Sequence, residues 1–546
     1  MNAWNFTATS YISGTPAVQR GVLYFCDFGG FLFAVDAFQG TEIWRYNLSS
    51  ATGISGDYCR ATPTLTPSNL YIGSTASAFF LKFDLDGNFQ SKVSLNAHPA
   101  AIITMGATFF DNKLYVGVSS NEEGLAIDPS YPCCSFRGSF HCLDANTLEI
   151  IWTAYSFPET YPTGPGGVSG VAYWGSSPVI DTRRDSVYVS TGNPYQIPQQ
   201  WQDCYALNGS KACIPSDVLF NAVISYDLCT GAVKWASRFS WYDAWSASCF
   251  YAGPNCPTVP GKDADFGMAP ILTRNGTQDI LLITQKSGVA WSLDPESGET
   301  LNFVLSSPGG SGGGSNWGAA TDGENYFVSA ANTNLINWTF VNPVPPCAST
   351  TTKGFFSKLC VSTLDIQCQV PIPDSNPANA VGTFGEGPPT VVNDLWIATS
   401  TNPTGKQVHL IDKNSCQILK SFSVGTVVYG GVSTYLNCIY VGTGYKPYYN
   451  PIWNAGQSKL FAFCIPFQEN SRLAKENKRV KASKHFLSLQ SSEKMALLQS
   501  TLKRGDMDSL VGLTIASVGA FVLVAFFAVF LWFRNRKISE QQAAIL

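Results

Sequence analysis

Short apolar segments recur along the first 466 residues, and Gly, Asn, Asp or Ser residues bound most of them. Four of these segments, 69–73, 113–117, 186–190 and 438–442, place Tyr-Ile or Tyr-Val before a small residue. Short runs rich in Tyr, Ile and Val and bounded by turn residues predict β-strands. The pattern therefore predicts an all-β fold over most of the chain.

A longer unit repeats around these strands. It consists of an apolar strand that ends in Asp, a turn that usually contains Gly, and a Trp eight residues after the Asp. The Asp accepts turn N–H groups, the Gly takes a positive φ, and the Trp ring fits between neighbouring units. The spacing is complete at Asp36 and Trp44, Asp144 and Trp152, and Asp227 and Trp235, while Asn302 follows Asp294 and Lys420 follows Asp412.

Two degenerate copies, near 83–84 and 356–368, bring the visible units to seven. Strands that repeat in this way, with loop insertions between them, predict the blades of a β-propeller. An eighth blade is expected if the two ends of the repeat region complete it. We place this propeller at residues 1–466.

The last part of the chain has a different pattern. Residues 510–533 contain no charged residue and would form a helix about 36 Å long, which is enough to span a membrane. Arg534, Arg536 and Lys537 follow at once. The positive-inside rule then predicts a single-pass type I protein with 1–508 exoplasmic and the tail 534–546 cytosolic. The domains are thus a propeller, a polar stalk at 467–508, a transmembrane helix at 509–533 and a tail.

The first residues do not resemble a signal peptide, because Met1 leads directly into a strand-like segment. Either the beginning of the chain is truncated, or the apolar helix is the sole targeting signal. We favour truncation.

Cysteine usage agrees with an extracellular or lumenal propeller. The chain has 16 Cys, several of them close together in loops. Such pairs are typical of disulfides formed in an oxidising compartment, and we predict Cys204–Cys213 and Cys249–Cys256. Glycosylation sequons begin at Asn5, Asn47, Asn208, Asn275 and Asn337.

Composition excludes several functions. A formal net charge of −4 leaves no basic surplus to neutralise phosphates and argues against nucleic-acid binding. With 4 His, no Cys-x-x-Cys-His haem motif and no zinc-type spacing, a metal would need oxygen ligands. Oxygen ligands suit a hard cation such as calcium.

Several motifs resemble those of the pyrroloquinoline-quinone (PQQ) dehydrogenase propellers, especially the polyvinyl-alcohol-dehydrogenase-like proteins. The resemblance extends from residue 4 to about 466 and implies an eight-bladed propeller with the quinone on its axis. The segments that carry it are 132–138, Trp174-Gly175-Ser176-Ser177-Pro178, Ser190-Thr191-Gly192-Asn193-Pro194, Asp243-Ala244-Trp245, Asp265-Phe266-Gly267, Gln285-Lys286-Ser287-Gly288 and Asn316-Trp317-Gly318.

The resemblance implies a site for PQQ and calcium. Glu122 and Asn193 correspond to metal ligands, although the adjacent Glu123 is an alternative to Glu122. Asp243 corresponds to the general base, which also reaches the metal. Taken alone, each of these residues would more often be a turn or capping residue.

Other residues correspond to cofactor contacts. Trp174 corresponds to the ring beneath the quinone and Lys286 to the cation on its oxygens, while Arg137, Asn316 and Trp317 are further candidates. Cys133 and Cys134 form either a vicinal disulfide over the cofactor or two separate pairs, for instance with Cys142.

Two functions follow as alternatives. One is a membrane-anchored, PQQ- and calcium-dependent oxidoreductase that acts on alcohols. Because the chain has no haem motif, its electrons would pass to an external acceptor. The other is a non-catalytic extracellular propeller that acts as a binding, receptor or adhesion module.

Overall fold

The computed structural model describes residues 2–312, 314, 317–344, 349–373, 383–402, 405–446 and 457–465. The chain divides into a larger unit, Asn2–Ser433 with Ile439–Phe463, and a smaller unit, Met1, Thr434–Cys438 and Cys464–Leu546. The predicted stalk and the apolar segment 510–533 lie outside the described residues. Among the helices that the structure does describe, none has the length and apolar character of a membrane span.

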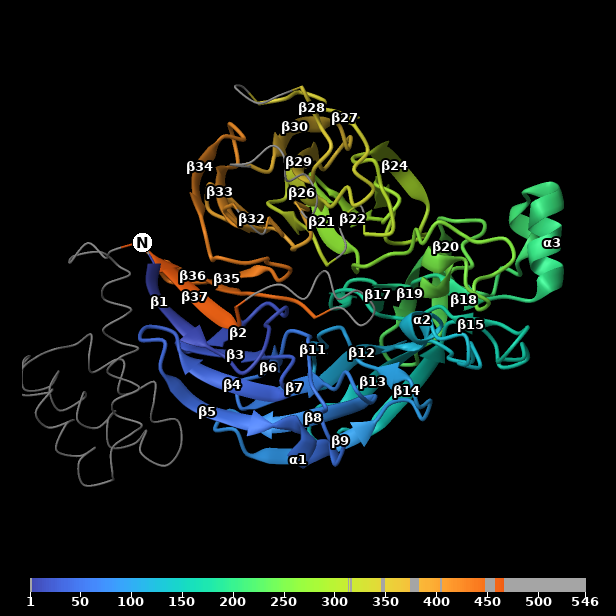
Figure 1. The fold of residues 1–546 in the computed structure, drawn as a ribbon, viewed down its shortest axis with the longest axis horizontal. Coiled ribbons are helices and arrows are strands. Elements are labelled where there is room, and N and C mark those ends of the chain that lie inside the picture. Colours follow the sequence, from blue (N-terminus) through green and yellow to red (C-terminus); the bar gives the residue numbers. More distant parts are fainter. Residues whose placement is uncertain are drawn as a thin grey trace, which may run out of the picture. The chain divides into compact units, whose positions relative to one another are not determined.

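Eight antiparallel sheets of four or five strands follow one another around the larger unit in the order of the sequence (Figure 1). The first three sheets are β2 (Ala17–Gln19), β3 (Val22–Cys26), β4 (Phe31–Asp36) and β5 (Glu42–Asn47); β6 (Thr64–Leu65), β7 (Asn69–Gly73), β8 (Phe79–Asp84) and β9 (Phe89–Ser94); and β10 (Ala101–Ile102), β11 (Thr108–Phe110), β12 (Lys113–Ser120), β13 (Ser139–Asp144) and β14 (Ile150–Tyr155).

The next four sheets repeat this order. They are β16 (Val179–Asp181), β17 (Ser186–Ser190), β19 (Ala222–Asp227) and β20 (Val233–Arg238); β21 (Ile271–Asn275), β22 (Gln278–Thr284), β23 (Val289–Leu293) and β24 (Thr300–Leu305); β25 (Ala320–Thr321), β26 (Asn325–Ala330), β29 (Phe355–Cys360) and β30 (Ile366–Pro371); and β31 (Thr390–Val392), β32 (Leu395–Thr399), β33 (Val408–Asp412) and β34 (Ile418–Phe422).

The eighth sheet joins the two ends of the repeat region. It has the order β1 (Asn2–Thr7), β37 (Lys459–Cys464), β36 (Cys438–Gly442) and β35 (Val432–Tyr435). β1 pairs antiparallel with β37, with Phe6 opposite Leu460. The predicted eight-bladed propeller, with its last blade completed from both ends, is confirmed.

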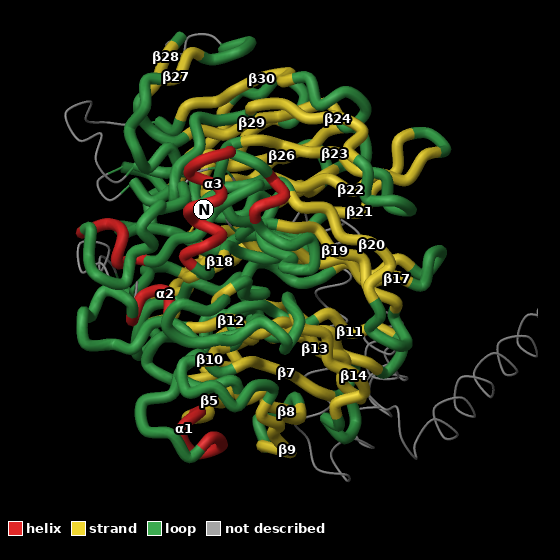
Figure 2. Tube along the Cα trace, turned by 90° about the vertical axis from the view of Figure 1, so that its right-hand side faces the viewer, coloured by secondary structure: helices red, strands yellow, loops and turns green. Residues whose placement is uncertain are grey.

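Smaller elements lie in the loops between these strands. Two short sheets pair β15 (Ser169–Gly170) with β18 (Pro194–Gln196) and β27 (Trp338–Thr339) with β28 (Thr350–Thr351). The described helices are α1 (Leu48–Thr52), α2 (Glu122–Leu125) and α3 (Gln199–Asn208), with 3₁₀ turns η1 (Lys211–Cys213) and η2 (Ala247–Tyr251). Figure 2 shows the strands of successive sheets lying side by side, with α2 and α3 among the loops in the left half of the view.

The position of a strand within its sheet explains its pattern. In the first sheet, β3 and β4 are almost entirely buried because each lies between two neighbouring blades. β5 alternates between exposed and half-buried residues, as expected for an outer edge. Fully buried inner strands therefore give continuous apolar runs, and these are the runs that the sequence displays.

The repeated Trp connects each blade to the next. Trp44 donates its indole N–H to the Leu85 carbonyl at 3.0 Å, and a Cβ on Gly87 would lie 2.7 Å from its ring. The equivalent bonds join Trp152 to Leu228, Trp235 to Pro295, and Trp4 to Ala37. Asn302, which replaces Trp, donates to Thr363 of the following sheet at 2.6 Å. The regular spacing of Asp and Trp in the sequence thus reflects a contact between neighbouring blades.

Six disulfides are present among the described residues. They include the predicted Cys204–Cys213 and Cys249–Cys256 pairs, and the others are Cys26–Cys59, Cys133–Cys134, Cys368–Cys416 and Cys438–Cys464. Of the two alternatives for Cys133 and Cys134, the structure contains the vicinal pair. Cys142 is a buried free thiol.

Candidate functional site

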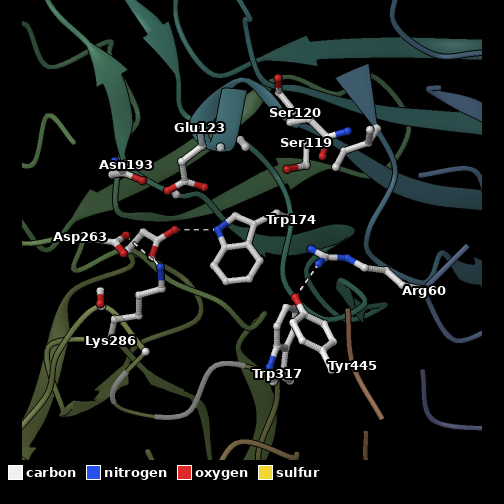
Figure 3. A pocket seen from close by; sticks show the side chains of 18 of the residues that line it. Arg60, Ser119, Ser120, Glu123, Trp174, Asn193, Asp263, Lys286, Trp317 and Tyr445 are labelled. Carbon is white, nitrogen blue, oxygen red and sulfur yellow. Dashed lines mark hydrogen bonds and ion pairs between the residues drawn. The ribbon is translucent and has the colours of Figure 1, made fainter. Parts of the chain in front are cut away.

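A cavity of about 470 Å³ lies within the larger unit, and loops from most of the sheets line it. Figure 3 shows its acidic side on the left, Trp174 in the middle, and Arg60 with Trp317 and Tyr445 on the other side. Of the residues predicted from the sequence, Trp174, Asn193, Lys286 and Trp317 line this cavity. Glu122, Asp243, Arg137, Cys133 and Cys134 are not among its lining residues, and Asn316 lies outside the described residues.

Three carboxylates line the acidic side: Glu123, Asp263 and Asp265. We refer to them as the cavity carboxylates. Lys286 forms ion pairs with Asp263 at 2.8 Å and with Asp265 at 2.7 Å. The buried Asp263 and Asp265 and the partly exposed Glu123 thus lie around one buried ammonium group. This part of the cavity has more carboxylate groups than cations to balance them.

Burial raises the proton affinity of two of these acids, Glu123 and Asp263. Burial raises the pKa of Glu123 to about 7, although Lys286 acts in the opposite direction. Burial also raises the pKa of Asp263 well above its ordinary value. Burial disfavours the charge on Lys286, but the neighbouring carboxylates outweigh it and hold the pKa of Lys286 well above its usual range. A bound cation would relieve this crowding of negative charge.

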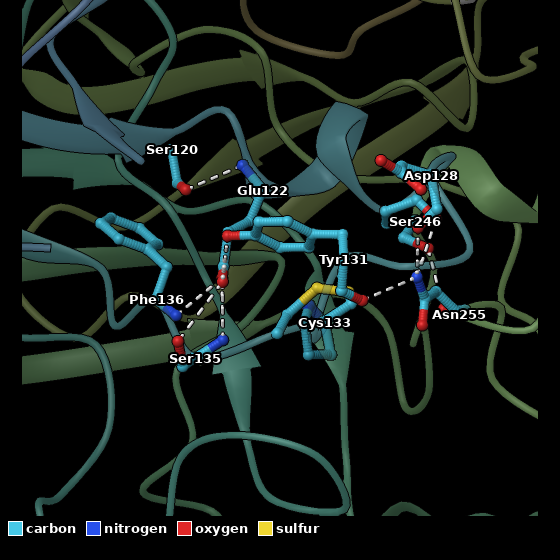
Figure 4. The surroundings of a disulfide bond; sticks show 12 residues. Ser120, Glu122, Asp128, Tyr131, Cys133, Ser135, Phe136, Ser246 and Asn255 are labelled. Atoms are coloured by element: carbon cyan, nitrogen blue, oxygen red, sulfur yellow. Dashed lines mark hydrogen bonds between the residues drawn. A yellow bond between two sulfur atoms is a disulfide. The ribbon is translucent and has the colours of Figure 1, made fainter. Parts of the chain in front are cut away.

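Glu122 and Glu123 are adjacent but face different surroundings. They begin α2, and consecutive residues of a helix point about 100° apart. The Glu122 carboxylate accepts the backbone N–H groups of Ser135 and Phe136 at 2.9 and 2.7 Å (Figure 4). The Tyr131 hydroxyl donates to it at 3.0 Å. Glu122 is fully buried and its oxygens are already occupied, so the neighbouring Glu123 is the one presented to the cavity.

The carboxylate of Asp243 is also fully used by hydrogen bonds from within the protein. Its carboxylate accepts the backbone N–H groups of residues 262–264 at 2.7 to 2.9 Å and the side-chain amide of Asn221 at 2.7 Å. These bonds shape the loop that brings Asp263 and Asp265 into the cavity. We refer to Glu122 and Asp243 as the backing carboxylates, since each organises a loop behind the cavity wall.

Asn193 faces the cavity carboxylates. Its amide nitrogen donates to the carbonyls of Pro194 and Trp245 at 3.1 and 2.9 Å. Both amide hydrogens are thereby used, so the carboxamide oxygen is the atom left for a ligand. The side chain is 1% exposed and lines the cavity.

Trp174 forms a flat wall beside the acidic side. Its indole N–H donates to Asp265 at 2.7 Å, and its backbone carbonyl accepts a hydrogen bond from the Thr104 hydroxyl at 2.9 Å. A Cβ on Gly192 would lie 2.9 Å from Asp265 and 3.0 Å from the Trp174 indole nitrogen. The Ser-Thr-Gly-Asn-Pro segment therefore needs glycine to let Trp174 and Asp265 meet.

The residues present suit a hard cation. Glu123 and Asp265 supply carboxylate oxygens and Asn193 an amide oxygen, the ligand types that calcium prefers. Within the described residues, however, no group of three or more His, Cys, Asp or Glu side chains is already arranged as a metal cluster. A metal would therefore draw one amide and two carboxylates together.

Arg137 lies in the scaffold. Its Nε donates to the Phe157 carbonyl at 2.7 Å, and its guanidinium lies 3.9 Å from the centre of the Tyr155 ring. The disulfide Cys133–Cys134 is buried beside Tyr131 and the backing carboxylate Glu122 (Figure 4). These residues support the loop that holds Glu122.

Asp263, Asp265 and Arg60 also line the cavity, although the sequence did not identify them as site residues. The segment Asp265-Phe266-Gly267 is one of the motifs that carry the family resemblance, so this motif could have identified Asp265 as a site residue. Asp263 and Arg60 had no comparable motif. Asp243 accepts the backbone N–H of Asp263 at 2.9 Å, but the sequence alone does not distinguish a backing carboxylate from a cavity carboxylate.

Comparisons with known proteins confirm the predicted resemblance. The chain is 30% identical over 340 residues to a polyvinylalcohol dehydrogenase of Sphingopyxis sp., a match that covers 59% of this chain and 49% of the relative. A polyvinylalcohol dehydrogenase of Pseudomonas sp. is 27% identical over 337 residues, covering 60% and 50%. The chain thus spans about half the length of these relatives. No family model matches the chain.

Solved structures share the fold. A quinohemoprotein alcohol dehydrogenase of Pseudomonas putida HK5 superimposes with a TM-score of 0.62 at 13% identity, covering 89% of this chain and 81% of that one. A europium-containing methanol dehydrogenase gives 0.60 at 15% identity, covering 85% and 93%. At such identities, the similarity concerns the propeller fold.

Proposed function

We propose that this chain is a PQQ- and calcium-dependent oxidoreductase that oxidises alcohol groups. The observation that carries the proposal is the cavity beside Trp174, which three carboxylates, one amide side chain and one lysine line. Relatives named polyvinylalcohol dehydrogenase and quinohemoprotein alcohol dehydrogenase support it. The site has a flat aromatic wall for a planar cofactor and oxygen ligands for a hard cation.

Glu123, Asn193 and Asp265 would hold the calcium. Of the two adjacent glutamates, Glu123 is the one that lines the cavity. When bound, calcium and the quinone would supply an electrophilic carbonyl that accepts a hydride. The Trp174 ring would support the cofactor plane. Lys286 would donate to cofactor oxygens once the cation shares Asp265, one of its two carboxylate partners.

The proton of the alcohol requires a base within the cavity. We assign this role to Asp265 because its carboxylate is held on both sides, by the Trp174 indole and by the Lys286 ammonium. Asp243 cannot fill it without releasing the loop 262–264 that it holds. Asp263 then serves as the counter-ion of Lys286.

The decisive experiment loads the full chain with PQQ and calcium and supplies primary and secondary alcohols. Reduction of an artificial dye acceptor measures turnover, since the electrons need an external acceptor. We expect turnover that disappears when a chelator is added before the cofactor. Cofactor binding without turnover on any alcohol would instead favour the binding-module function.

We also propose that the propeller is exoplasmic and anchored through residues 510–533. The apolar segment, its basic flank and the disulfides support this topology. Expression of the complete gene product in a secretory host should give a glycosidase-sensitive protein whose propeller is cut by externally added protease. A protein with protease access to the tail alone would have the opposite topology.

A further inference from the structure

Two aromatic side chains lie at the mouth of the cavity. Phe250 and Tyr251, the last residues of η2, line the cavity and are nevertheless 52% and 71% exposed. Of the other lining residues that the structure describes, only Asn334 and Lys446 are also exposed. Exposed lining residues mark the place where a cavity opens to solvent, so this pair forms one edge of the opening. We refer to Phe250 and Tyr251 as the mouth aromatics.

The turn that carries the mouth aromatics is fastened at several points. The disulfide Cys249–Cys256 closes it, and the Ser246 hydroxyl donates to the Asn255 carbonyl at 3.2 Å. The Asn255 side-chain amide nitrogen lies 3.0 to 3.2 Å from three carbonyl oxygens, those of Ala126, Asp128 and Tyr131 (Figure 4). This segment directly follows α2, so the turn is tied to the acidic side of the cavity.

Phe250 also packs against a fixed neighbour. Its ring meets the Trp245 ring edge to face, with centroids 5.0 Å apart. Trp245 is buried, and its backbone carbonyl accepts the Asn193 side-chain amide at 2.9 Å. The position of Phe250 is therefore set relative to Asn193 on the cavity wall. A surface that is already fixed loses little conformational freedom when a ligand binds, which favours binding.

Folding gains little from the mouth aromatics. An aromatic side chain contributes to folding through the area that it buries, and both of these remain more than half exposed. Single exposed apolar residues are common on protein surfaces, and Phe303 of β24, at 63%, is one that does not line the cavity. The mouth aromatics differ from Phe303 because they are adjacent, lie on a fastened turn and border the cavity. This combination indicates a binding surface.

The mouth differs in chemistry from the interior of the cavity. Inside, the cavity carboxylates and Lys286 present charged groups, whereas the mouth aromatics present two rings and one phenol hydroxyl. Two adjacent rings suit the uncharged, C–H-rich part of a ligand. A cavity of about 470 Å³ leaves little room for a long alcohol beside a planar cofactor, so the unreacted chain of such an alcohol would extend through the mouth.

We propose that the mouth aromatics bind the hydrocarbon chain of the alcohol substrate and make the protein prefer alcohols with longer chains. The hydroxyl end of the substrate enters the cavity, and its chain lies across Phe250 and Tyr251. This inference rests on the proposed function for the reaction. The choice of these two residues rests on the geometry of the mouth.

The first test measures the preference for chain length. The full chain, loaded with PQQ and calcium, is supplied with ethanol, 1-butanol, 1-hexanol and 1-octanol, and dye reduction gives kcat and KM for each. We expect kcat/KM to rise with chain length. The double variant Phe250→Ala with Tyr251→Ala should lower kcat/KM for 1-octanol roughly tenfold, mainly through a higher KM, and the loss should be smallest for ethanol. An unchanged dependence on chain length in the double variant would overturn the proposal.

Two control variants separate the subsite from a general effect on folding. Phe303→Ala removes a similarly exposed ring that does not line the cavity, and it should keep the dependence on chain length. Phe250→Leu combined with Tyr251→Phe keeps two apolar side chains at the mouth and should recover most of kcat/KM for 1-octanol. A loss in Phe303→Ala as large as in the double alanine variant, or no recovery in the conservative variant, would contradict the assignment.

A second test does not require turnover. Saturation-transfer NMR of 1-hexanol with the cofactor-free full chain, in the presence of EGTA, reports how closely the terminal methyl group of the alcohol approaches the protein. The methyl signal should be roughly twofold weaker or less with the double alanine variant than with the unaltered chain. Equal methyl signals would overturn the subsite. If the loaded protein oxidises no alcohol while the methyl signal still falls in the variant, the proposed function fails and the subsite stands.

Discussion

The backing carboxylates and the cavity carboxylates share the same chemistry, and only Glu123 among them is partly exposed, yet they differ in what surrounds them. Glu122 and Asp243 accept at least three hydrogen bonds each, mostly from backbone N–H groups. Glu123, Asp263 and Asp265 meet one another and Lys286. Backbone donors fix a carboxylate within its loop, as at Asp243, even though burial raises the pKa of that group to about 6, whereas the crowded carboxylates can share a cation. Burial of an acid therefore does not by itself identify a site.

This difference first predicts a loss of catalysis when a cavity carboxylate is neutralised. Asp265→Asn should lower turnover of PQQ- and calcium-loaded protein roughly 10²- to 10⁴-fold, the usual cost of removing a general base. Dye-linked activity measures the rate, and fluorescence quenching by PQQ checks that the cofactor still binds.

The matched control is Asp263→Asn, which removes a counter-ion of Lys286 and keeps Asp265. A larger rate loss in Asp263→Asn than in Asp265→Asn, with equal cofactor occupancy, would transfer the base role to Asp263.

Acid should affect the scaffold through two buried histidines, His141 and His409. Burial lowers the pKa of each to about 3, and each ring lies between two hydroxyl groups. Since the folded-state pKa lies below the unfolded value, the unfolded state binds more protons between about pH 3 and 6.5. Each histidine should thus lower the free energy of unfolding by about 2 kcal/mol at pH 5 relative to pH 8.

Denaturant unfolding at several pH values measures this slope. The double variant His141→Gln with His409→Gln keeps side chains able to bond the hydroxyls and should flatten the slope. An unchanged slope would place the acid-sensitive groups elsewhere.

The two adjacent glutamates give the sharpest test of the comparison. Glu122→Gln should destabilise the fold by about 2–3 kcal/mol, because a neutral amide replaces a carboxylate that accepts backbone N–H groups. Glu123→Gln in metal-free protein should instead raise stability by roughly 1–3 kcal/mol, since it removes one of three crowded charges. Unfolding with EGTA present measures both.

Calcium then separates the two roles further. Calcium should stabilise Glu122→Gln as much as it stabilises the unaltered chain, and should stabilise Glu123→Gln less. The same sign for both substitutions without metal would remove the distinction between backing and cavity carboxylates.

The smallest effect is expected at Arg137, which lies outside the cavity. Arg137→Lys should change the Kd of PQQ less than about twofold and lower the free energy of unfolding by about 1 kcal/mol, through the lost contacts with Phe157 and Tyr155. Equilibrium titration and denaturant unfolding give the two numbers. A large loss of cofactor affinity would show that Arg137 reaches the ligand after all.

The sequence by itself determined the propeller. Asp, Gly and Trp recur at a fixed spacing because a blade-to-blade contact needs all three, as Trp44 and Gly87 illustrate. Local turns and strands have short-range signatures, so their order and the short disulfide Cys204–Cys213 could be predicted. Asn193, Trp174, Lys286 and Trp317, which lie in motifs of the resemblance, all line the cavity, and their roles toward a metal or a cofactor stay predictions.

Only the tertiary structure decided which acids face the cavity. Glu122 and Glu123 differ by one step of a short helix, and the choice depends on where the amides of Ser135 and Phe136 lie. Asp243 and Asp265 are likewise distinguished by a loop that folds back over Asp243. Arg60 became a site residue because Tyr445, 385 positions away in sequence, lies beside it. Which groups a side chain meets is set by long-range packing, and no local pattern encodes those partners.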